Sequence, residues 1–245
     1  MLSEFEKLTE KKRLAALPPL ERPINVRLKF RKVGKLQYIS HLDLQRTFMR
    51  VIVRACIPAW YTKGFNPHAK LVFSTPLSVG SESEYEFLDL RIDRDMPPEE
   101  IMRRLNAELT DELCITDAYI PTSDFSEIAY ATYDINICTE GASVQMAEQI
   151  KTLLTTSPFV ITKKTKSGEK DIDIVPLIKS VDVGFADGRI IMSATLSASV
   201  GEFLNPELLI GGLKDKCGIL SGNPTEEWYT IMRMSVRRSD MSLFR

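Results

Sequence analysis

Hydrophobic and polar positions along this chain change period several times, and each change marks an expected element. The residues VRLKFR at 26–31 place an apolar side chain at every second position, which is the pattern of a half-buried strand. The other face of that strand is cationic throughout. Ser40, with an acid three positions later, forms a capping-box signature, and the apolar spacing that follows predicts a helix over 41–57, ended by Pro58.

The remainder of the first half predicts further elements in a definite order. Strands are expected at 70–74 and 85–92, followed by a helix at 98–111 and a strand at 114–120. The order strand, helix, strand, strand, helix, strand is that of the ferredoxin-like, or split βαβ, arrangement. In that arrangement two helices cover one face of an antiparallel four-stranded sheet.

The second half repeats this theme with additions. Strands are expected at 129–137, 159–164, 171–175, 181–185, 189–196 and 231–238, and helices at 143–154 and 205–215. We therefore predict an α+β protein of two tandem ferredoxin-like units. The predicted domains are an N-terminal helical extension over 1–25, a first unit with a basic surface over 26–124 and a second unit over 125–245.

The net charge of −1 conceals two segments of opposite sign. Residues 26–70 hold ten Lys and Arg against one acid, a net charge of +9, whereas residues 81–128 hold fourteen acids against four Arg, a net charge of −10. Clustered cations attract polyanions through a long-range field that salt screens, so the basic segment predicts a polyanionic partner. The alternative is a solvated basic face that the acidic segment neutralises within the fold.

Two features of the basic segment suit a nucleic acid. Arginines recur at i, i+4 and i+8 of the expected helix, so they form one ridge with steps of about 6 Å. Between that helix and the next strand, aromatic residues interleave with basic ones, as base stacking and phosphate neutralisation together require. The residues predicted to contact RNA are Arg27, Lys29, Arg31, Lys35, Tyr38, Arg46, Arg50, Arg54, Trp60, Tyr61, Lys63, Phe65, Asn66, His68 and Lys70.

Structural roles for the same residues remain open at this point. The three arginines of the ridge could lie along the helix flank and pair with the acidic segment. Trp60 and Phe65 could instead fill the edge of the core beneath the loop. The two histidines of the chain, His41 and His68, both fall in the basic segment, so metal-free RNA cleavage by general acid–base catalysis is an alternative function.

Other chemistry lacks a signature. No GxSxG, Walker loop, GxGxxG or HExxH motif occurs. Four cysteines stand singly, without metal-ligand spacing, and are interpreted as small hydrophobes in apolar settings. The alternating Glu82, Glu84 and Glu86 are interpreted as a strand edge rather than a metal site. We expect no cofactor and no metal.

The sequence predicts no membrane-spanning segment. No apolar run approaches the roughly 20 residues that span a bilayer. The N-terminal segment is too acidic and too interrupted in its hydrophobicity for a signal peptide, so we expect a cytoplasmic location. The oligomeric state is left open by the sequence.

Three blocks of sequence resemble a known bacterial family. They are YISHLDLQRTFMRVIVRACIP at 38–58, GFNPH at 64–68 and PLSVGSESE at 76–84. The family is that of the radical-SAM-linked proteins of unknown function, which are encoded beside or fused to cobalamin-binding-type radical SAM proteins. The resemblance implies a radical SAM protein as a partner. More distantly, the same blocks resemble tandem ferredoxin-like proteins that process CRISPR RNA, which implies RNA rather than DNA.

The chain itself has no CxxxCxxC cluster motif, so any radical chemistry would belong to the partner. The leading hypothesis is therefore an RNA-binding accessory protein that works with a separate enzyme. The two alternatives are a metal-independent endoribonuclease that uses His41 or His68, and an interaction module that docks on the radical SAM protein.

Overall fold

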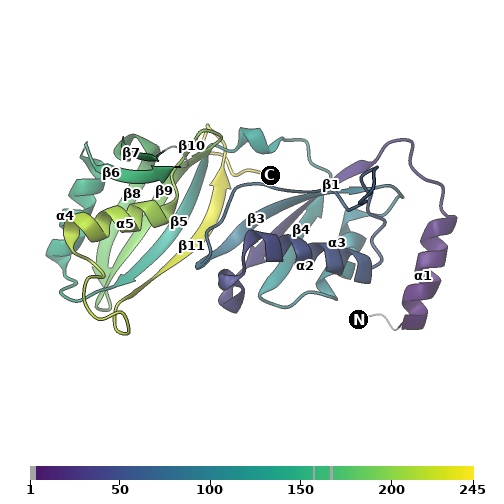
Figure 1. Cartoon of the computed structure of the whole chain (residues 1–245), viewed down its shortest axis with the longest axis horizontal. Helices are drawn as coiled ribbons and strands as arrows, with labels where there is room; N and C mark the ends of the chain where they lie inside the picture. The colour runs from purple at the N-terminus through teal and green to yellow at the C-terminus, as the bar shows by residue number, and fades with distance from the viewer. Residues whose placement is uncertain (1–3, 157, 166–167) are drawn as a thin grey trace. The chain divides into compact units, whose positions relative to one another are not determined.

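The computed structural model describes residues 4–156, 158–165 and 168–245, which fall into two compact units. Unit 1 contains the described residues up to Asp124 together with Arg245, and unit 2 is Phe125–Phe244 (Figure 1). The described residues form five α-helices, and their strands pair antiparallel, so the protein is of the mixed α+β type.

Unit 1 has a four-stranded sheet in which the first strand is central. Its elements are α1 (Glu4–Ala16), β1 (Ile24–Lys32), the short 3₁₀ helix η1 (Gly34–Tyr38), α2 (His41–Arg54), β2 (Leu71–Phe73), β3 (Ser81–Ile92), α3 (Pro98–Asn106) and β4 (Leu113–Tyr119). β1 pairs antiparallel with both β3 and β4, and β2 pairs antiparallel with β3. The sheet order is therefore β4-β1-β3-β2.

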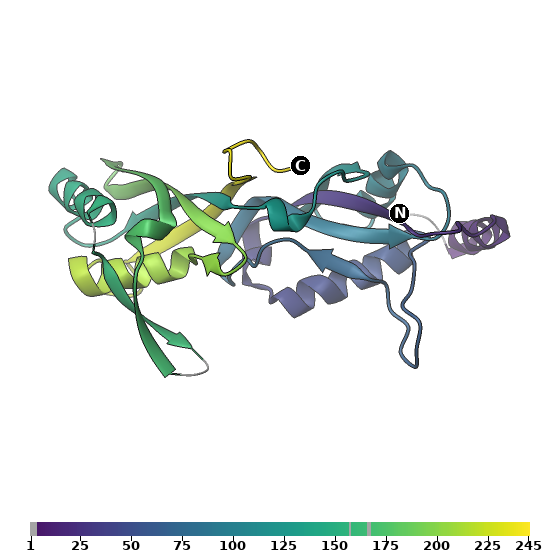
Figure 2. The ribbon, with the colours of Figure 1, turned by 90° about the horizontal axis from the view of Figure 1, so that it is seen from above.

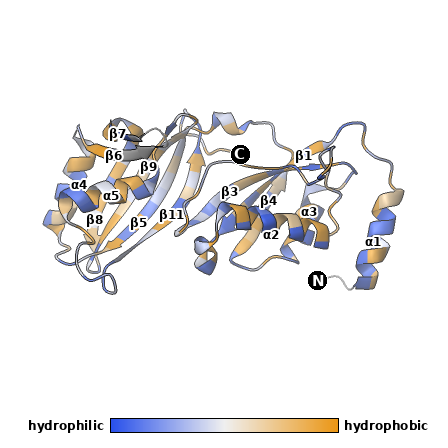
Figure 3. Ribbon diagram, viewed as in Figure 1, coloured by the Kyte–Doolittle hydropathy of each residue, from blue (hydrophilic) through white to orange (hydrophobic). Residues whose placement is uncertain are grey.

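The core of unit 1 lies between this sheet and helices α2 and α3. Alternate residues of β1, such as Leu28 and Phe30, are fully buried and face Phe48 and Ile52 of α2 within one apolar cluster. α2 has both strongly hydrophobic and strongly hydrophilic residues along its length (Figure 3). Its start follows the capping-box prediction, because the Ser40 hydroxyl accepts a hydrogen bond from the Asp43 amide. The helix buries Leu44, Phe48, Val51 and Ile52, as its apolar spacing predicts for one face.

Three predicted boundaries in unit 1 are wrong by three residues or more. α2 ends at Arg54 rather than at residue 57, because Cys56 adopts a positive φ of 54°, which no α-helix contains. α3 ends at Asn106 rather than at 111, and the Asn106 side chain bonds both the N–H and the C=O of Ile115 in β4. β3 begins at Ser81 rather than at 85, so the alternating acids lie inside the strand.

Unit 2 follows a similar order with an insertion. Its elements are the 3₁₀ helix η2 (Phe125–Glu127), β5 (Tyr130–Cys138), α4 (Val144–Thr155), β6 (Val160–Thr165), β7 (Gly168–Asp173), η3 (Val175–Leu177), β8 (Ile178–Ala186), β9 (Arg189–Ser199), β10 (Glu202–Phe203), α5 (Pro206–Cys217) and β11 (Trp228–Arg237). β5 lies between β9 and β11, β8 and the short β10 pair with β9, and all these pairs are antiparallel. β6 and β7 form a separate two-stranded hairpin.

The core of unit 2 is built like that of unit 1. Every second residue of β5, from Ala131 to Ile137, is buried, and α4 and α5 each bury one apolar stripe. The inserted hairpin contacts α5 at Gly212, where an added Cβ would lie 2.6 Å from the side chain of Ile161. The glycine at this position is therefore required by close packing.

Candidate nucleic-acid interface

The cationic outer face expected on β1 is not a free surface, because Arg27 is buried. Its side chain is 1% exposed and its guanidinium forms a two-pronged pair with the Asp89 carboxylate, with N···O distances of 2.7 and 3.0 Å. Its third nitrogen donates to the Ser123 hydroxyl at 2.8 Å. Arg27 and Asp89 lie opposite each other in the β1–β3 register, so strand pairing brings the two charges together. The prediction that Arg27 faces outward toward RNA is wrong.

The next two cations of β1 are also engaged within unit 1. The Lys29 ammonium lies 3.7 Å from the centre of the Tyr85 ring, and burial lowers the pKa of this lysine. The Arg31 guanidinium donates twice to the backbone carbonyl of Asp111, at 3.0 and 2.7 Å. Both side chains are partly exposed, but their cationic groups have structural partners.

The three arginines of the α2 ridge differ in their contacts. Arg54 donates to the buried Glu108 carboxylate at 2.9 Å and to its backbone carbonyl, so the pairing with the acidic segment that was left open occurs here. Arg46 lies 3.5 Å from the exposed Asp43 carboxylate, an arrangement that contributes little in water. Arg50 is exposed and has no ion pair with any described residue. Arg50, and more weakly Arg46, remain available to an external anion.

The segment from Trp60 to Lys70, hereafter the 60–70 loop, is a short hairpin-like excursion at the start of β2. Tyr61 forms a bridge with Ala69, and the Thr62 amide donates to the His68 carbonyl at 2.9 Å. One ring nitrogen of His68 lies 3.0 Å from the Asn66 carbonyl, and the His68 amide donates to the Thr62 hydroxyl. Figure 2 shows the loop projecting from the body of its own unit.

The tip of the 60–70 loop is exposed and basic. Phe65 has a relative exposure of 112%, so the ring packs into no core. The alternative that Phe65 fills the edge of the core beneath the loop is wrong. Lys63, His68 and Lys70 of the same loop are exposed, and none of their side chains forms an ion pair with a described acid. Gly64 has a positive φ of 135°, which permits the turn before Phe65.

Trp60 has a different role at the base of the loop. It is half-buried, and its amide donates to the Arg91 carbonyl at 2.8 Å, which fixes the loop to the end of β3. Arg91 is exposed and without an ion pair among the described residues, yet sequence reasoning missed it because it lies in the acidic segment. Arg91 lies beside the basic loop because β2 pairs with β3, with Leu71 opposite Leu90. The sequence alone does not reveal this pairing.

The remaining predicted residues lie at the other end of β2, near the start of α2. Lys35 and Tyr38 belong to η1 and are exposed, with Tyr38 at 68%. The His41 ring meets Phe73, the last residue of β2, edge to face at a centroid distance of 4.9 Å. β2 therefore runs from the 60–70 loop at its start to the His41 ring at its end, whereas the Lys35 amide donates to the Glu112 carboxylate next to β4.

The geometry of the two histidines does not assemble a general acid and a general base. One ring nitrogen of His68 contacts the Asn66 carbonyl within its own loop, and the His41 ring contacts Phe73 edge to face. In the part of the chain that the structure describes, neither ring hydrogen-bonds a carboxylate, Lys35 or Tyr38. The same described residues contain no group of three or more His, Cys, Asp or Glu side chains placed to hold a metal ion.

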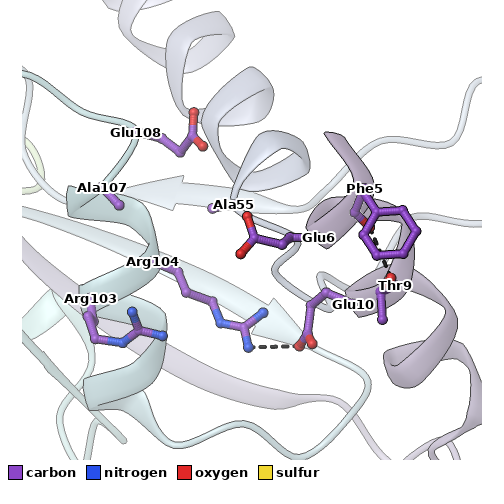
Figure 4. Close-up of a pocket in the computed structure, with 9 residues that line it drawn as sticks. All are labelled: Phe5, Glu6, Thr9, Glu10, Ala55, Arg103, Arg104, Ala107 and Glu108. Carbon is purple, nitrogen blue, oxygen red and sulfur yellow. Dashed lines mark hydrogen bonds and ion pairs between the residues drawn. The ribbon is translucent and has the colours of Figure 1, made fainter. Parts of the chain in front are cut away.

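A cavity beside α2 and α3 has a different character (Figure 4). This cavity of about 430 Å³ lies between α1 and the ends of α2 and α3. Arg104 points across it to Glu10 of α1, with an N···O distance of 2.7 Å, and Lys7 reaches Glu108 at 3.1 Å. Hydrogen bonds from Arg13 and Arg104 hold the pKa of Glu10 at about 2. Because these charges neutralise one another, the cavity offers no surplus of cations to RNA.

These observations define an α+β protein whose first unit presents exposed basic and aromatic side chains in the loop that precedes β2. Residues 25–206 match the model of a family described as an uncharacterized protein conserved in bacteria, DUF2344, and the chain belongs to that family. No curated protein matches the chain. Among the described residues, no helix is both long and apolar enough to cross a membrane.

Proposed function

We propose that this protein binds RNA through the 60–70 loop and holds it for a separate enzyme. The observation that supports this most strongly is the exposure of Lys63, Phe65, His68 and Lys70 in one loop, without a described acidic partner. Cations that are clear of carboxylates can form charge-assisted hydrogen bonds with phosphates. An exposed ring beside them can stack on a base.

We also infer that both units are ferredoxin-like. This is supported by the sheet orders β4-β1-β3-β2 in unit 1 and β11-β5-β9-β8 in unit 2, each with a helix after its first and third strands. A fold of this kind does not by itself define a function. The buried Arg27–Asp89 pair occupies the sheet face opposite α2, which favours the loop over that face as the RNA contact.

The enzyme that uses the bound RNA is proposed to be a radical SAM protein in a bacterial cell. The support is the resemblance of the 38–58, 64–68 and 76–84 blocks to radical-SAM-linked proteins, together with the absence of a CxxxCxxC motif from this chain. On this account the protein supplies binding and orientation, and the partner supplies the chemistry.

The first experiment measures RNA affinity as a function of salt concentration. Binding through several Lys and Arg contacts releases about one counterion for each phosphate neutralised, so log Kd should rise steeply with log salt. The double substitution of Lys63 and Lys70 by Gln should weaken binding by about tenfold at moderate salt and reduce the salt slope.

A matched control is available in unit 2. Lys214 and Lys216 of α5 are exposed and without ion pairs among the described residues, and their double substitution by Gln removes the same charge. We expect this control to change affinity by less than about twofold, because charges away from the site add little through screened solvent. Equal losses in the two double variants, or a wild-type salt slope near zero, would remove the support for the loop.

A cleavage assay separates the accessory role from the nuclease alternative. We expect wild-type protein to leave RNA intact with a chelator present near neutral pH. Cleavage that disappears in His68→Ala, while binding of RNA persists, would establish the nuclease and contradict the accessory role.

A further inference from the structure

We propose that the 60–70 loop selects single-stranded RNA, with the Phe65 ring stacking on an unpaired base. This rests on the proposed RNA-binding function and names the class of RNA that the loop accepts. The inference starts from Phe65, whose relative exposure of 112% shows that the ring packs against nothing in the protein. Nearby Tyr61 is also 43% exposed, so the loop offers two aromatic groups to solvent.

Hydrogen bonds within the 60–70 loop fix its conformation in the absence of a ligand. The Tyr61–Ala69 bridge closes its base, and the Thr62–His68 and His68–Asn66 hydrogen bonds hold its two sides together. A braced loop loses less conformational entropy on binding than a mobile one, so more of the stacking free energy is retained. Phe65 itself adds little entropy cost, because its ring has only two rotatable bonds.

The chemistry around Phe65 favours an unpaired base over a duplex. Bases within an A-form duplex are stacked on each other, and the deep, narrow major groove does not admit side chains. An aromatic ring at a loop tip can reach the face of a base only when that base is unstacked. Lys63 lies two residues before Phe65, and Lys70 follows the Tyr61–Ala69 bridge at the base of the loop, so the two exposed lysines can neutralise phosphates of a strand that runs along the loop.

The test compares a 12-nucleotide single strand of mixed sequence with the duplex formed by its complement, using wild type, Phe65→Leu and Phe65→Trp. Leucine keeps an apolar side chain but removes the flat ring, whereas tryptophan enlarges it. We expect wild type to bind the single strand at least about tenfold more tightly than the duplex. Phe65→Leu should lose about tenfold on the single strand, since stacking on one base contributes on the order of a five- to hundredfold difference in affinity.

The control readouts distinguish stacking from charge and from folding. The salt slope should be the same in all three proteins, because no charge changes. Thermal unfolding should also be unchanged, because Phe65 has no packing partners to lose. Phe65→Trp should retain the single-strand preference.

The outcomes separate this inference from the function on which it rests. Wild-type protein that binds single strand and duplex equally, with no effect of Phe65→Leu, would overturn the inference and leave RNA binding standing. Wild-type protein that binds neither RNA would overturn both. Binding to vesicles of phosphatidylglycerol that Phe65→Leu abolishes, together with equal affinity for the two RNAs, would assign the ring to a membrane surface and also overturn the inference.

Discussion

Unit 1 and unit 2 share an order of strands and helices but differ in what they insert at the same point. Between α2 and β2, unit 1 carries the 60–70 loop, which combines two lysines with Phe65 and Tyr61. Unit 2 carries the β6–β7 hairpin at the corresponding point, and the sequence of its two strands has no aromatic residue (Figure 2). The difference teaches that a common scaffold supports distinct surfaces, and that the RNA contact proposed for unit 1 belongs to the insertion.

Each unit also buries an arginine. Arg27 of unit 1 is paired with the Asp89 carboxylate, and Arg233 of unit 2, which is 0% exposed, donates to the Tyr133 hydroxyl at 3.2 and 3.3 Å and has further interactions. A buried guanidinium must be compensated, because an uncompensated charge in the interior is strongly destabilising. The same residue type that suggested a nucleic-acid surface in the sequence is here part of the structural interior.

The largest expected effect follows from removing the partner of Arg27. Asp89→Ala should lower the free energy of unfolding by about 3–5 kcal/mol, because it leaves the guanidinium buried without its carboxylate. Tyr133→Phe, which removes one neutral acceptor from Arg233, should cost only about 1–2 kcal/mol. Urea denaturation of both variants measures the comparison. Equal losses would show that the charged acceptor of Arg27 contributes no more than the neutral acceptor of Arg233.

The adjacent glycines Gly211 and Gly212 of α5 test whether packing against the β6–β7 hairpin explains the need for glycine. Gly212→Ala should cost about 1–3 kcal/mol, because its new Cβ would meet the Ile161 side chain in the hairpin. Gly211→Ala should stabilise the protein by up to about 1 kcal/mol, since its Cβ would meet nothing and alanine favours the helix. Thermal unfolding of the two variants gives opposite shifts. A loss at both positions would mean that the hairpin does not explain the need for Gly212.

The lysines of the 60–70 loop and of the β6–β7 hairpin allow the two insertions to be compared by their contribution to RNA affinity. The segment 160–173 contains Lys163, Lys164, Lys166 and Lys170, interspersed with three acids, so its net charge is only +1. Substituting all four by Gln should weaken RNA binding by less than about threefold, against about tenfold for the two lysines of the 60–70 loop. A larger loss from the unit 2 set would contradict the assignment of RNA binding to unit 1.

The smallest expected effect is a loosening of helix α1 in unit 1 at low pH. Glu10 has its pKa held at about 2 by hydrogen bonds from Arg13 and Arg104. A carboxyl with a lowered folded-state pKa stabilises the fold above its ordinary pKa of 4.5, and this stabilisation is lost as the pH falls toward 2. α1 should therefore loosen over this range, which the methyl NMR signals of Leu14, the buried residue of this helix, would report. Glu10→Gln should reduce the pH dependence and leave the part that comes from Glu108, whose pKa is lowered despite burial by the Lys7 side chain of α1.

The sequence predicted the elements better than the roles of their charged residues. Alternation along β1 and the Ser40 cap are local signals, so strand and helix could be placed to within a few residues. The burial of Arg27 could not be predicted, because it depends on Asp89, which lies 62 residues away in sequence and is brought opposite by strand register. Within the candidate interface, the 60–70 loop was recognisable because its aromatic and basic residues are contiguous, whereas Arg91 reaches it only through pairing in the sheet.

The most direct test of the central claim is to locate the contact by ultraviolet cross-linking of the full-length protein to a single-stranded RNA, followed by mass spectrometry of the digested protein. Cross-linked nucleotides should be found on peptides that contain Phe65 and Tyr61, because rings stacked on bases are the groups in closest contact with them. Phe65→Leu should reduce the yield at that position. Cross-links confined to unit 2, or spread over both units without enrichment in the 60–70 loop, would contradict the account.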